Sequence, residues 1–465
     1  MSFSESCRCL VDYYRCPPEL VHLEVRTPRN SPPGYFRFGE ETTCFGRMAG
    51  PPPAPSPAAS LHDASRDMQV ERGSVTLPFD PGEVAENLRH ENYAGPRGSG
   101  SSSLIGRLYY LLRPLLPVSV RRHLQKFRLR NWDQLPFPRW PVDFSVDAMM
   151  ESLLLAVSRA SGRPIPFIWF WPDGHSACIL ITHDVEEAAG RDFCSTLMDL
   201  DATHGFRSSF QIIPEKRYSV SPEFLESIRA RGFEVDVHDL NHDGHLYRER
   251  SEFLQRVEKI NEYGRSFRAE GFRAGVLYRN QEWFDALEFS YEMSVPNVAH
   301  LDPQRGGCCT VMPYFIGNLL EIPVTTVQDY TLFNILEDFS IDLWRKQTRL
   351  ILDRHGLMSF IVHPDYIADS RNRAVYESLL AHLATLVKEE GVWSTTPGEL
   401  NHWWRERSAM QLVQRDGSWR IEGFGSERAR LAWASEQNGR LVLTLEDREK
   451  ESEVWAESRP RQANA

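Results

Sequence analysis

The stretch Ile179-Leu180-Ile181-Thr182-His183-Asp184-Val185-Glu186 joins a short apolar run to a group of polar side chains. The run follows a turn-forming Pro-Asp-Gly sequence, which is typical of a strand buried on both faces. Asp184 and Glu186 are two residues apart, so on an extended backbone both carboxylates point to the same side. Buried carboxylates are costly unless they bind something, and ligands of α/β proteins bind at the carboxyl ends of strands. The stretch therefore predicts a strand that ends in a functional site.

Segments with strand and helix patterns alternate beyond this stretch, as far as residue 405. Alternation at this spacing predicts a parallel sheet with helical crossovers, and about seven units favour a barrel over an open sheet. The predicted strands are 177–183, 209–213, 233–237, 319–324, 357–362 and 392–395, and the predicted helices are 187–204, 222–231, 251–270, 281–289, 341–355, 372–389 and 397–405.

Two histidines, His238 and His242, follow the predicted strand 233–237. On a helical turn their four-residue spacing would place both imidazoles on one face, within reach of one cation. The carboxyl ends of parallel strands share one rim, so these imidazoles should lie near Asp184 and Glu186. Three of the four groups would then complete a catalytic zinc site and leave the fourth free as a general base. The alternative is a pair of surface histidines in a polar loop.

Two further candidates fall at the same rim. Arg273 follows a short predicted strand, and an arginine near a carboxylate keeps it ionised and oriented. His363 ends the strand 358–362 and is suited to act as a general acid. The alternatives are a surface salt bridge for Arg273 and a capped loop histidine for His363.

These motifs resemble, in order and spacing, those of the polysaccharide deacetylase family (NodB-homology domain, carbohydrate esterase family 4), in its Asp-x-Asp/Glu branch. The resemblance covers roughly residues 165–405. It implies an α/β fold with a distorted (β/α)7 barrel, and a divalent metal, usually Zn²⁺. It also implies hydrolysis of an N-acetyl group from an amino sugar, with a polysaccharide or glycolipid as the carbohydrate substrate. Carried over to this sequence, the implied roles are Asp184 as base, His363 as acid, Arg273 as the residue that orients the base, and Glu186, His238 and His242 as metal ligands.

The sequence departs from the family pattern at Glu186, where the family usually has an aspartate. The additional methylene moves the carboxylate by about one bond, whereas zinc–ligand distances tolerate only a few tenths of an ångström. Either the local backbone absorbs the difference, or Glu187 or His183 takes the ligand position. A catalytically inactive carbohydrate-binding relative is the corresponding alternative function.

Composition outside the barrel predicts the remaining organisation. Residues 1–130 read as an irregular N-terminal extension with flexible linkers at 51–60 (Pro/Ala/Ser-rich) and 95–103 (Gly/Ser-rich). The barrel is expected over 131–407. Alternating apolar and polar residues, together with turn signals, predict a small antiparallel β extension over 408–450. The polar residues 451–465 are predicted to form a disordered tail.

Residues 104–130 combine arginines and leucines without an acidic residue. One interpretation is a basic amphipathic segment in peripheral contact with an anionic membrane, as in a membrane-surface component of polysaccharide assembly. The favoured interpretation is a helix packed on the catalytic domain, because Pro114 and Pro117 interrupt a continuous face.

Bulk properties exclude several classes. The net charge of −11 argues against nucleic-acid binding. The sequence has neither a signal-peptide pattern nor a run of 18 apolar residues, which predicts a cytoplasmic protein without a transmembrane segment. The eight cysteines are expected to be reduced thiols. No Gly-x-Ser-x-Gly motif or Walker-type loop is present, so a serine hydrolase or a P-loop nucleotide-binding protein is not expected.

Overall fold

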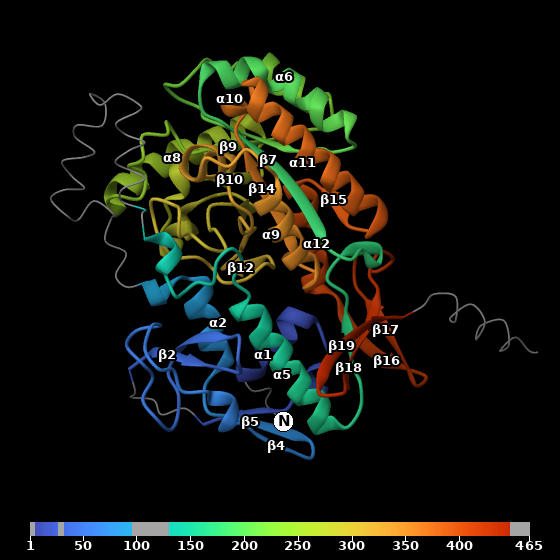
Figure 1. The fold of residues 1–465 in the computed structure, drawn as a ribbon. Helices are drawn as coiled ribbons and strands as arrows, with labels where there is room; N and C mark the ends of the chain where they lie inside the picture. The colour runs from blue at the N-terminus through green and yellow to red at the C-terminus, as the bar shows by residue number, and fades with distance from the viewer. Residues whose placement is uncertain (1–4, 27–31, 95–128, 130, 447–465) are drawn as a thin grey trace, which may run out of the picture.

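The computed structural model describes residues 5–26, 32–94, 129 and 131–446. In Figure 1 the α/β part, drawn in green, yellow and orange, lies above the N-terminal part in blue and the C-terminal strands in red. The basic segment 104–130 (apart from residue 129), the linker 95–103 and the tail 451–465 lie outside the described residues, so their predictions stay predictions.

The central sheet is mostly parallel and confirms the α/β class with a distorted barrel. Its strand order is β14-β7-β8-β9-β10-β11-β13-β12. Strand β15 pairs with the first half of β7, on the same edge of β7 whose second half pairs with β8. Only the β12–β13 pairing within it is antiparallel. The strands are β7 (Cys178–Val185), β8 (Ser209–Ile212), β9 (Glu234–His238), β10 (Gly271–Arg273), β11 (Tyr291–Glu292), β12 (Tyr314–Ile316), β13 (Leu319–Glu321), β14 (Leu357–Val362) and β15 (Trp393–Thr395).

Side chains rather than a strand ladder link the segment after β13 to β14. Thr325 Oγ1 donates a hydrogen bond to the carbonyl of Leu357 at 2.7 Å, and Thr326 Oγ1 donates to that of Ser359 at 2.8 Å. These bonds satisfy buried carbonyls that would otherwise lack a partner. The barrel is distorted here because hydroxyls take the place of backbone N–H donors.

Strand β7 is buried along its whole length, as the opening stretch predicted. Ile179, Ile181 and Val185 face the helical layer, whereas Cys178 and Leu180 pack on the opposite side. Such β-branched, two-sided burial is typical of a central parallel strand. The strand continues two residues beyond the predicted end at 183, so Asp184 lies within it and Glu186 directly after it.

The helices lie close to their predicted positions, with one exception. The segment predicted as a helix at 281–289 forms a shorter 3-10 helix, η8 (Gln281–Ala286). The side chain of Asn280 caps its first turn, and the helix ends where the backbone becomes extended at Leu287. The remaining helices of this part are α6 (Ala188–Thr203), α7 (Pro222–Arg229), α8 (Arg250–Phe267), α9 (Asp342–Leu352), α10 (Pro364–Ile367), α11 (Ser370–Glu389) and α12 (Pro397–Ala409). In the described residues, no helix is both long enough and apolar enough to cross a membrane.

A second core joins the two ends of the chain beneath the barrel (Figure 1). The C-terminal residues form antiparallel pairs, and β18 also pairs with β6, so these strands are continuous with an earlier part of the chain. The N-terminal extension is more regular than predicted. Its elements and those packed with it are α1 (Glu5–Tyr14), β1 (Leu23–Val25), β2 (Gly34–Arg37), β3 (Thr43–Gly46), β4 (Gln69–Glu71), β5 (Ser74–Leu77), α2 (Pro81–Arg89), α5 (Ser145–Ser161), β6 (Ile165–Ile168), β16 (Gln411–Arg415), β17 (Ser418–Glu422), β18 (Leu431–Gln437) and β19 (Arg440–Leu445).

The Pro/Ala/Ser-rich segment 51–60, predicted as a flexible linker, is mostly exposed but pairs with β2 at Ala54. Tyr35 and Ala54 exchange two backbone hydrogen bonds, of 2.7 and 2.8 Å. Proline limits the backbone freedom of the segment, so two bonds are enough to fix it against β2. The boundaries expected at residues 130, 407 and 450 remain predictions.

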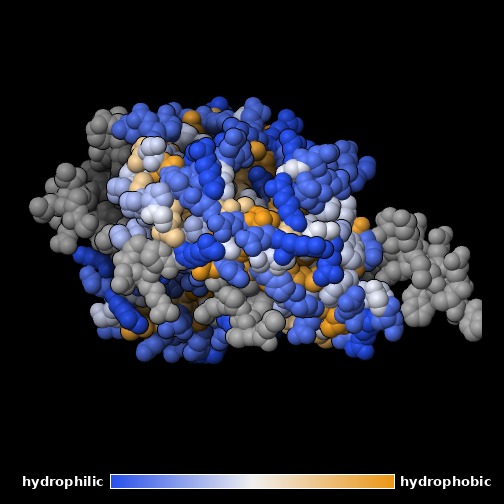
Figure 2. Space-filling view, turned by 90° about the horizontal axis from the view of Figure 1, so that it is seen from below, coloured by the Kyte–Doolittle hydropathy of each residue, from blue (hydrophilic) through white to orange (hydrophobic). Residues whose placement is uncertain are grey.

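The face of the molecule in Figure 2 is mostly hydrophilic, and hydrophobic side chains show in small patches between polar ones. Scattered apolar side chains of this kind are normal on a folded protein.

Candidate metal centre

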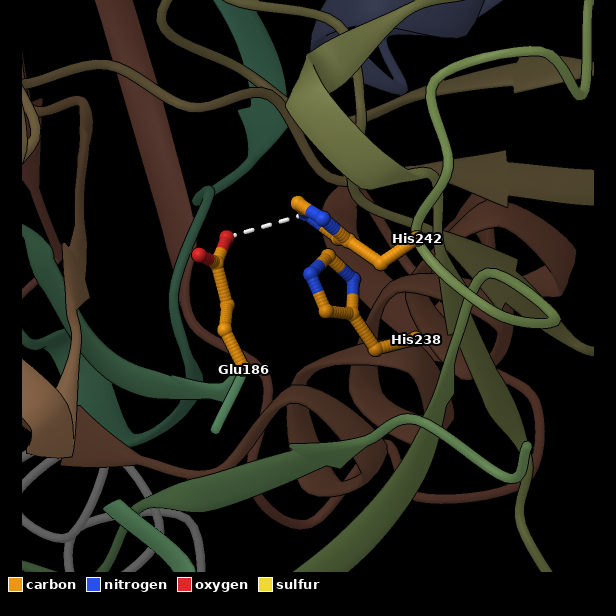
Figure 3. Close-up of side chains that lie close together, drawn as sticks. All are labelled: Glu186, His238 and His242. Carbon is orange, nitrogen blue, oxygen red and sulfur yellow. Dashed lines mark ion pairs between the residues drawn. The ribbon is translucent and has the colours of Figure 1, made fainter. Parts of the chain in front are cut away.

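Three side chains from two strand ends converge at the carboxyl rim of the barrel. Glu186 follows β7, His238 ends β9, and His242 lies in the loop after β9. One ligand atom from each lies within 4.8 Å of the other two. Glu186 Oε1 is 2.9 Å from His242 Nε2, and the two imidazoles lie side by side with ring centroids 5.0 Å apart (Figure 3). Within the described residues, this is the one group of three or more such side chains close enough to share an ion.

A loop brings the two histidines together, which corrects the predicted helical turn. Asp239 and His242 adopt positive φ angles of 56° and 54°, so the chain doubles back directly after β9. Such angles are uncommon for residues other than glycine and are often seen at functional sites. Gly275 passes close by, and a Cβ there would lie 2.8 Å from His242 Cδ2. The absence of a side chain at Gly275 leaves the space that this imidazole occupies.

The hydrogen bonds of His238 leave one ring nitrogen free for a ligand. Its Nδ1 lies 3.1 Å from the carbonyl of Arg273, which can only accept, so Nδ1 carries the proton and Nε2 has the lone pair. Nε2 is buried and has no hydrogen-bond partner among the described residues, whereas Nε2 of His242 faces Glu186 Oε1 at 2.9 Å. Two imidazole nitrogens and a carboxylate suit a zinc-like cation, and a second-shell carbonyl commonly orients such a ligand. The residues present therefore fit a divalent metal.

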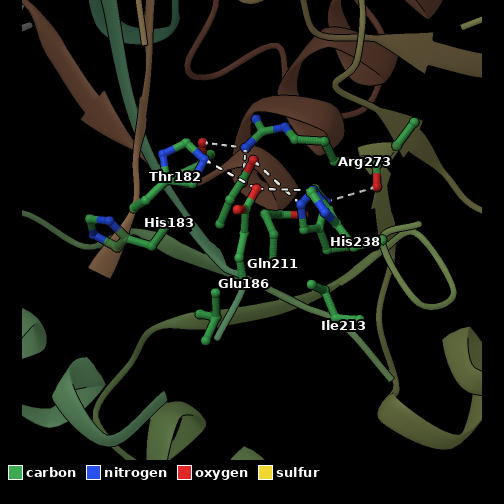
Figure 4. A network of polar contacts seen from close by, with 12 residues as sticks. Thr182, His183, Glu186, Gln211, Ile213, His238 and Arg273 are labelled. Atoms are coloured by element: carbon green, nitrogen blue, oxygen red, sulfur yellow. Dashed lines mark hydrogen bonds and ion pairs between the residues drawn. The ribbon is translucent and has the colours of Figure 1, made fainter. Parts of the chain in front are cut away.

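Asp184 lies beside this group and is bound to Arg273, both side chains being buried. Arg273 Nη1 donates to Asp184 Oδ1 at 2.6 Å and to Thr182 Oγ1 at 2.7 Å (Figure 4). Burial alone would raise the pKa of Asp184, but Arg273, together with His238 and His363, outweighs it and holds the pKa below the usual value. Asp184 Oδ2 is 3.8 Å from His238 Nε2, so the carboxylate is ionised and close to the predicted ligands.

His363 faces the group from the end of β14. Its Nε2 is 3.6 Å from Glu186 Oε1, and its Nδ1 is 2.6 Å from Asp329 Oδ1. Asp329 Oδ2 also accepts the backbone N–H of His363 at 2.7 Å. Burial disfavours the imidazolium, but Asp329 and Glu186 more than compensate, so the pKa of His363 lies well above its usual value. The surroundings of His363 thus favour the protonated imidazole, and Asp329 is a further carboxylate at this rim.

The two alternatives to Glu186 lie elsewhere. His183 points away from the rim, with Nε2 2.8 Å from Asp201 on α6. Glu187 pairs with Arg217 at 2.7 Å at the surface. Burial would raise the pKa of Glu186, but His242 lowers it well below its usual value, so this carboxylate is ionised. The longer side chain thus reaches the histidines without a substitute.

Sequence reasoning missed Asp365, which accepts three backbone N–H groups around Glu186. Its signal was its place two residues after His363. Trp169 and Trp171, which precede β7, are buried in the core. Tyr330 lies at the rim, 5.7 Å between ring centroids from Tyr366, whose own ring is 5.2 Å from that of His363.

An α/β barrel with these polar residues at its carboxyl rim is the class of fold and site that this chain presents. Known proteins can be compared with it. No protein-family model and no curated protein sequence matches the chain. Among solved structures, the chain is similar to a protein from Mycobacterium smegmatis assigned as a polysaccharide deacetylase (18% identity, 51% of this chain and 93% of that chain, TM-score 0.43). It is also similar to the allantoinase PuuE (12%, 50% and 92%, 0.41) and to a mutant of the peptidoglycan deacetylase PdaC from Bacillus subtilis (13%, 51% and 96%, 0.33). Because a shared fold does not establish a shared function, the function has to be argued from the side chains of the site.

Proposed function

We propose that the protein is a metal-dependent hydrolase that removes an N-acetyl group from an amino sugar of a polysaccharide or glycolipid. The observation that carries the proposal is the convergence of Glu186, His238 and His242 between an ionised Asp184 and a protonated His363. Environments that leave one group basic and another acidic mark the base and the acid of a proton-transfer site.

Glu186, His238 and His242 would hold the metal, with Zn²⁺ as the favoured ion. When bound, such a cation polarises a carbonyl and lowers the pKa of a water molecule towards neutrality. Asp184 then accepts the proton of the water that adds to the acetamide carbon. Arg273 keeps Asp184 ionised and fixes its direction through the 2.6 Å contact.

His363 supplies the second proton. As the C–N bond breaks, the imidazolium protonates the leaving nitrogen, which yields acetate and the free amino sugar. Asp329 holds the ring through Nδ1, so Nε2 faces the site and carries the proton that is transferred. Base and acid thus come from two different strands of one rim, Asp184 from β7 and His363 from the end of β14.

Acetate release from N-acetylated amino-sugar oligomers tests the proposal. The Zn²⁺-loaded wild type should release acetate, and Asp184→Asn should lower the rate by about 10²–10⁴-fold, the usual contribution of a general base. Asp369→Asn is a matched control, because this carboxylate caps α11 and the substitution keeps an oxygen acceptor. Equal rates in wild type and Asp184→Asn would remove Asp184 as the base, whereas a protein that binds Zn²⁺ and oligosaccharide without releasing acetate would be an inactive carbohydrate-binding relative.

A further inference from the structure

The amide groups at the start of α6 are bound by a carboxylate from a distant part of the chain. Glu187 occupies the N-cap position but makes no side-chain hydrogen bond to the helix. Instead, Asp365 Oδ2 accepts the N–H groups of Glu186 at 3.2 Å and Glu187 at 3.3 Å, and Oδ1 accepts that of Gly190 at 2.8 Å. The first N–H groups of a helix have no partner within it, and a negative charge is favourable there. Asp365 therefore caps α6 across 175 residues of sequence.

The packing around this carboxylate leaves little room for another arrangement. A Cβ on Gly190 would overlap with the carboxylate of Asp365. Asp365 is the second residue of α10, whose N-cap is His363 and whose first residue is Pro364. Proline fixes the backbone at the first helical position, so the direction of Asp365 follows from that of His363.

These contacts connect the backbone of one predicted ligand to the backbone of the predicted acid. Glu186 is bound at its own N–H, and its side chain extends to His242 at 2.9 Å and His363 at 3.6 Å. A glutamate side chain has one more rotatable bond than an aspartate, so the position of its backbone decides where the carboxylate can reach. A ligand is well placed only if the groups behind it are fixed.

We propose that Asp365 is a positioning residue, which sets where the Glu186 carboxylate stands relative to His242 and His363. The inference rests on the proposed function for the identity of the ion, but the hydrogen bonds that Asp365 accepts do not depend on which ion binds. It accounts for how this chain uses a glutamate where an aspartate is usual: the turn after β7 is bound at three N–H groups, so the longer side chain starts from a fixed point.

A role limited to capping is the competing explanation, and α11 offers the matched control. Asp369 Oδ1 accepts the N–H groups of Arg371 at 2.9 Å and Asn372 at 3.2 Å. Asp369 is the N-cap residue of α11 and lies four residues after Asp365, but α11 carries none of the predicted ligands. The variants Asp365→Ala and Asp369→Ala therefore each remove one helix cap, and only the first also frees the backbone of Glu186.

The experiment compares the full-length wild type with Asp365→Ala, Asp365→Asn and Asp369→Ala. Three readouts are taken: the Kd for Zn²⁺ by competition titration, the visible absorption of the Co²⁺-loaded protein, and the hydrogen-exchange rates of the amides at 186, 187 and 190 without metal. Asp365→Ala should raise the Kd about tenfold or more, change the Co²⁺ spectrum and accelerate exchange at these amides. Asp365→Asn keeps one oxygen acceptor and should restore part of each effect, and Asp369→Ala should leave all three readouts as in the wild type.

Two outcomes would be decisive against these proposals, and they are distinguishable. If Asp365→Ala binds Zn²⁺ with the Kd and Co²⁺ spectrum of the wild type, Asp365 only caps α6 and the positioning role is wrong. If the wild type itself binds no Zn²⁺, the proposed function is overturned, and the exchange rates alone decide whether Asp365 orders the amides around Glu186.

Discussion

Glu186 and His242 face each other across the mouth of the barrel, with Oε1 of the carboxylate 2.9 Å from Nε2 of the imidazole. His242 is almost fully buried, and burial would lower its pKa, yet the contact with Glu186 raises it. The two groups thus form an ion pair in which a proton takes the place that a cation would occupy between them. A metal that binds here must displace that proton.

Metal affinity is therefore expected to depend on pH. Because the pKa of His242 is raised, the proton competes with the metal below that pKa, and the Kd for Zn²⁺ should fall by up to about tenfold per pH unit as the pH rises towards it. Titration calorimetry in buffers of different ionisation enthalpy should report release of about one proton per ion near neutral pH. A Kd that does not change over this range would contradict the description of Glu186 and His242 as an ion pair.

Shortening the predicted carboxylate ligand should weaken metal binding. In Glu186→Asp the carboxylate retreats by about one bond while the backbone stays bound to Asp365, and the distances to zinc tolerate only a few tenths of an ångström. The Kd for Zn²⁺ should rise at least about tenfold. Glu226→Asp is the control, because that side chain pairs with Arg268 at the surface and should leave the Kd unchanged.

The buried ion pair between Glu91 and Arg279 should stabilise the contact between the N-terminal extension and the barrel. Both side chains are almost fully buried, and Glu91 also accepts the N–H of Gly307. Glu91→Gln leaves the arginine without a counter-charge and should lower the free energy of unfolding by about 3–5 kcal/mol. Denaturant unfolding measures the loss, and the double variant Glu91→Leu with Arg279→Met should lose less than Glu91→Gln. A loss below about 1 kcal/mol in Glu91→Gln would show that the pair is dispensable.

Stability should fall as the pH rises from about 4.5 to about 8, with Glu234 as one cause. Burial, followed by the nearby Asp236, raises the pKa of Glu234 from 4.5 to about 8. The unfolded chain releases this proton first, so deprotonation favours the unfolded state, and the penalty is complete above the folded pKa. Glu234→Gln should flatten the decline by at least about 1 kcal/mol, since one pKa unit corresponds to about 1.4 kcal/mol. Denaturant unfolding midpoints measured across this pH range check the prediction. An equal dependence of stability on pH in the wild type and in Glu234→Gln would contradict the assignment.

Much of the barrel could be predicted because its signals are local. The apolar run of β7 marks a strand buried on both faces, and the alternation of strands and helices marks parallel crossovers. The rim residues could be predicted to approach one another because carboxyl ends of parallel strands share one side of a sheet. The spacing of His238 and His242 indicated proximity, although a loop and not a helical turn produces it.

The remaining features depend on contacts between distant segments. Glu91 and Arg279 are 188 residues apart, and neither neighbourhood distinguishes a buried pair from two surface charges. The pairing of β18 with β6 joins segments whose own patterns fit an isolated hairpin equally well. Asp365 binds the turn after β7 through backbone N–H groups, which every residue but proline offers, so no residue type in that turn points to the contact.

The central claim is that Glu186, His238 and His242 bind one divalent metal, and metal analysis tests it most directly. Full-length protein reconstituted with Zn²⁺ and then freed of excess ion should contain about one ion per chain, as a site with three protein ligands implies. The double variant His238→Ala with His242→Ala should contain almost none, whereas His245→Ala, which removes a partly exposed neighbouring histidine, should retain it. A wild type without bound ion, or a double variant that retains it, would contradict the claim.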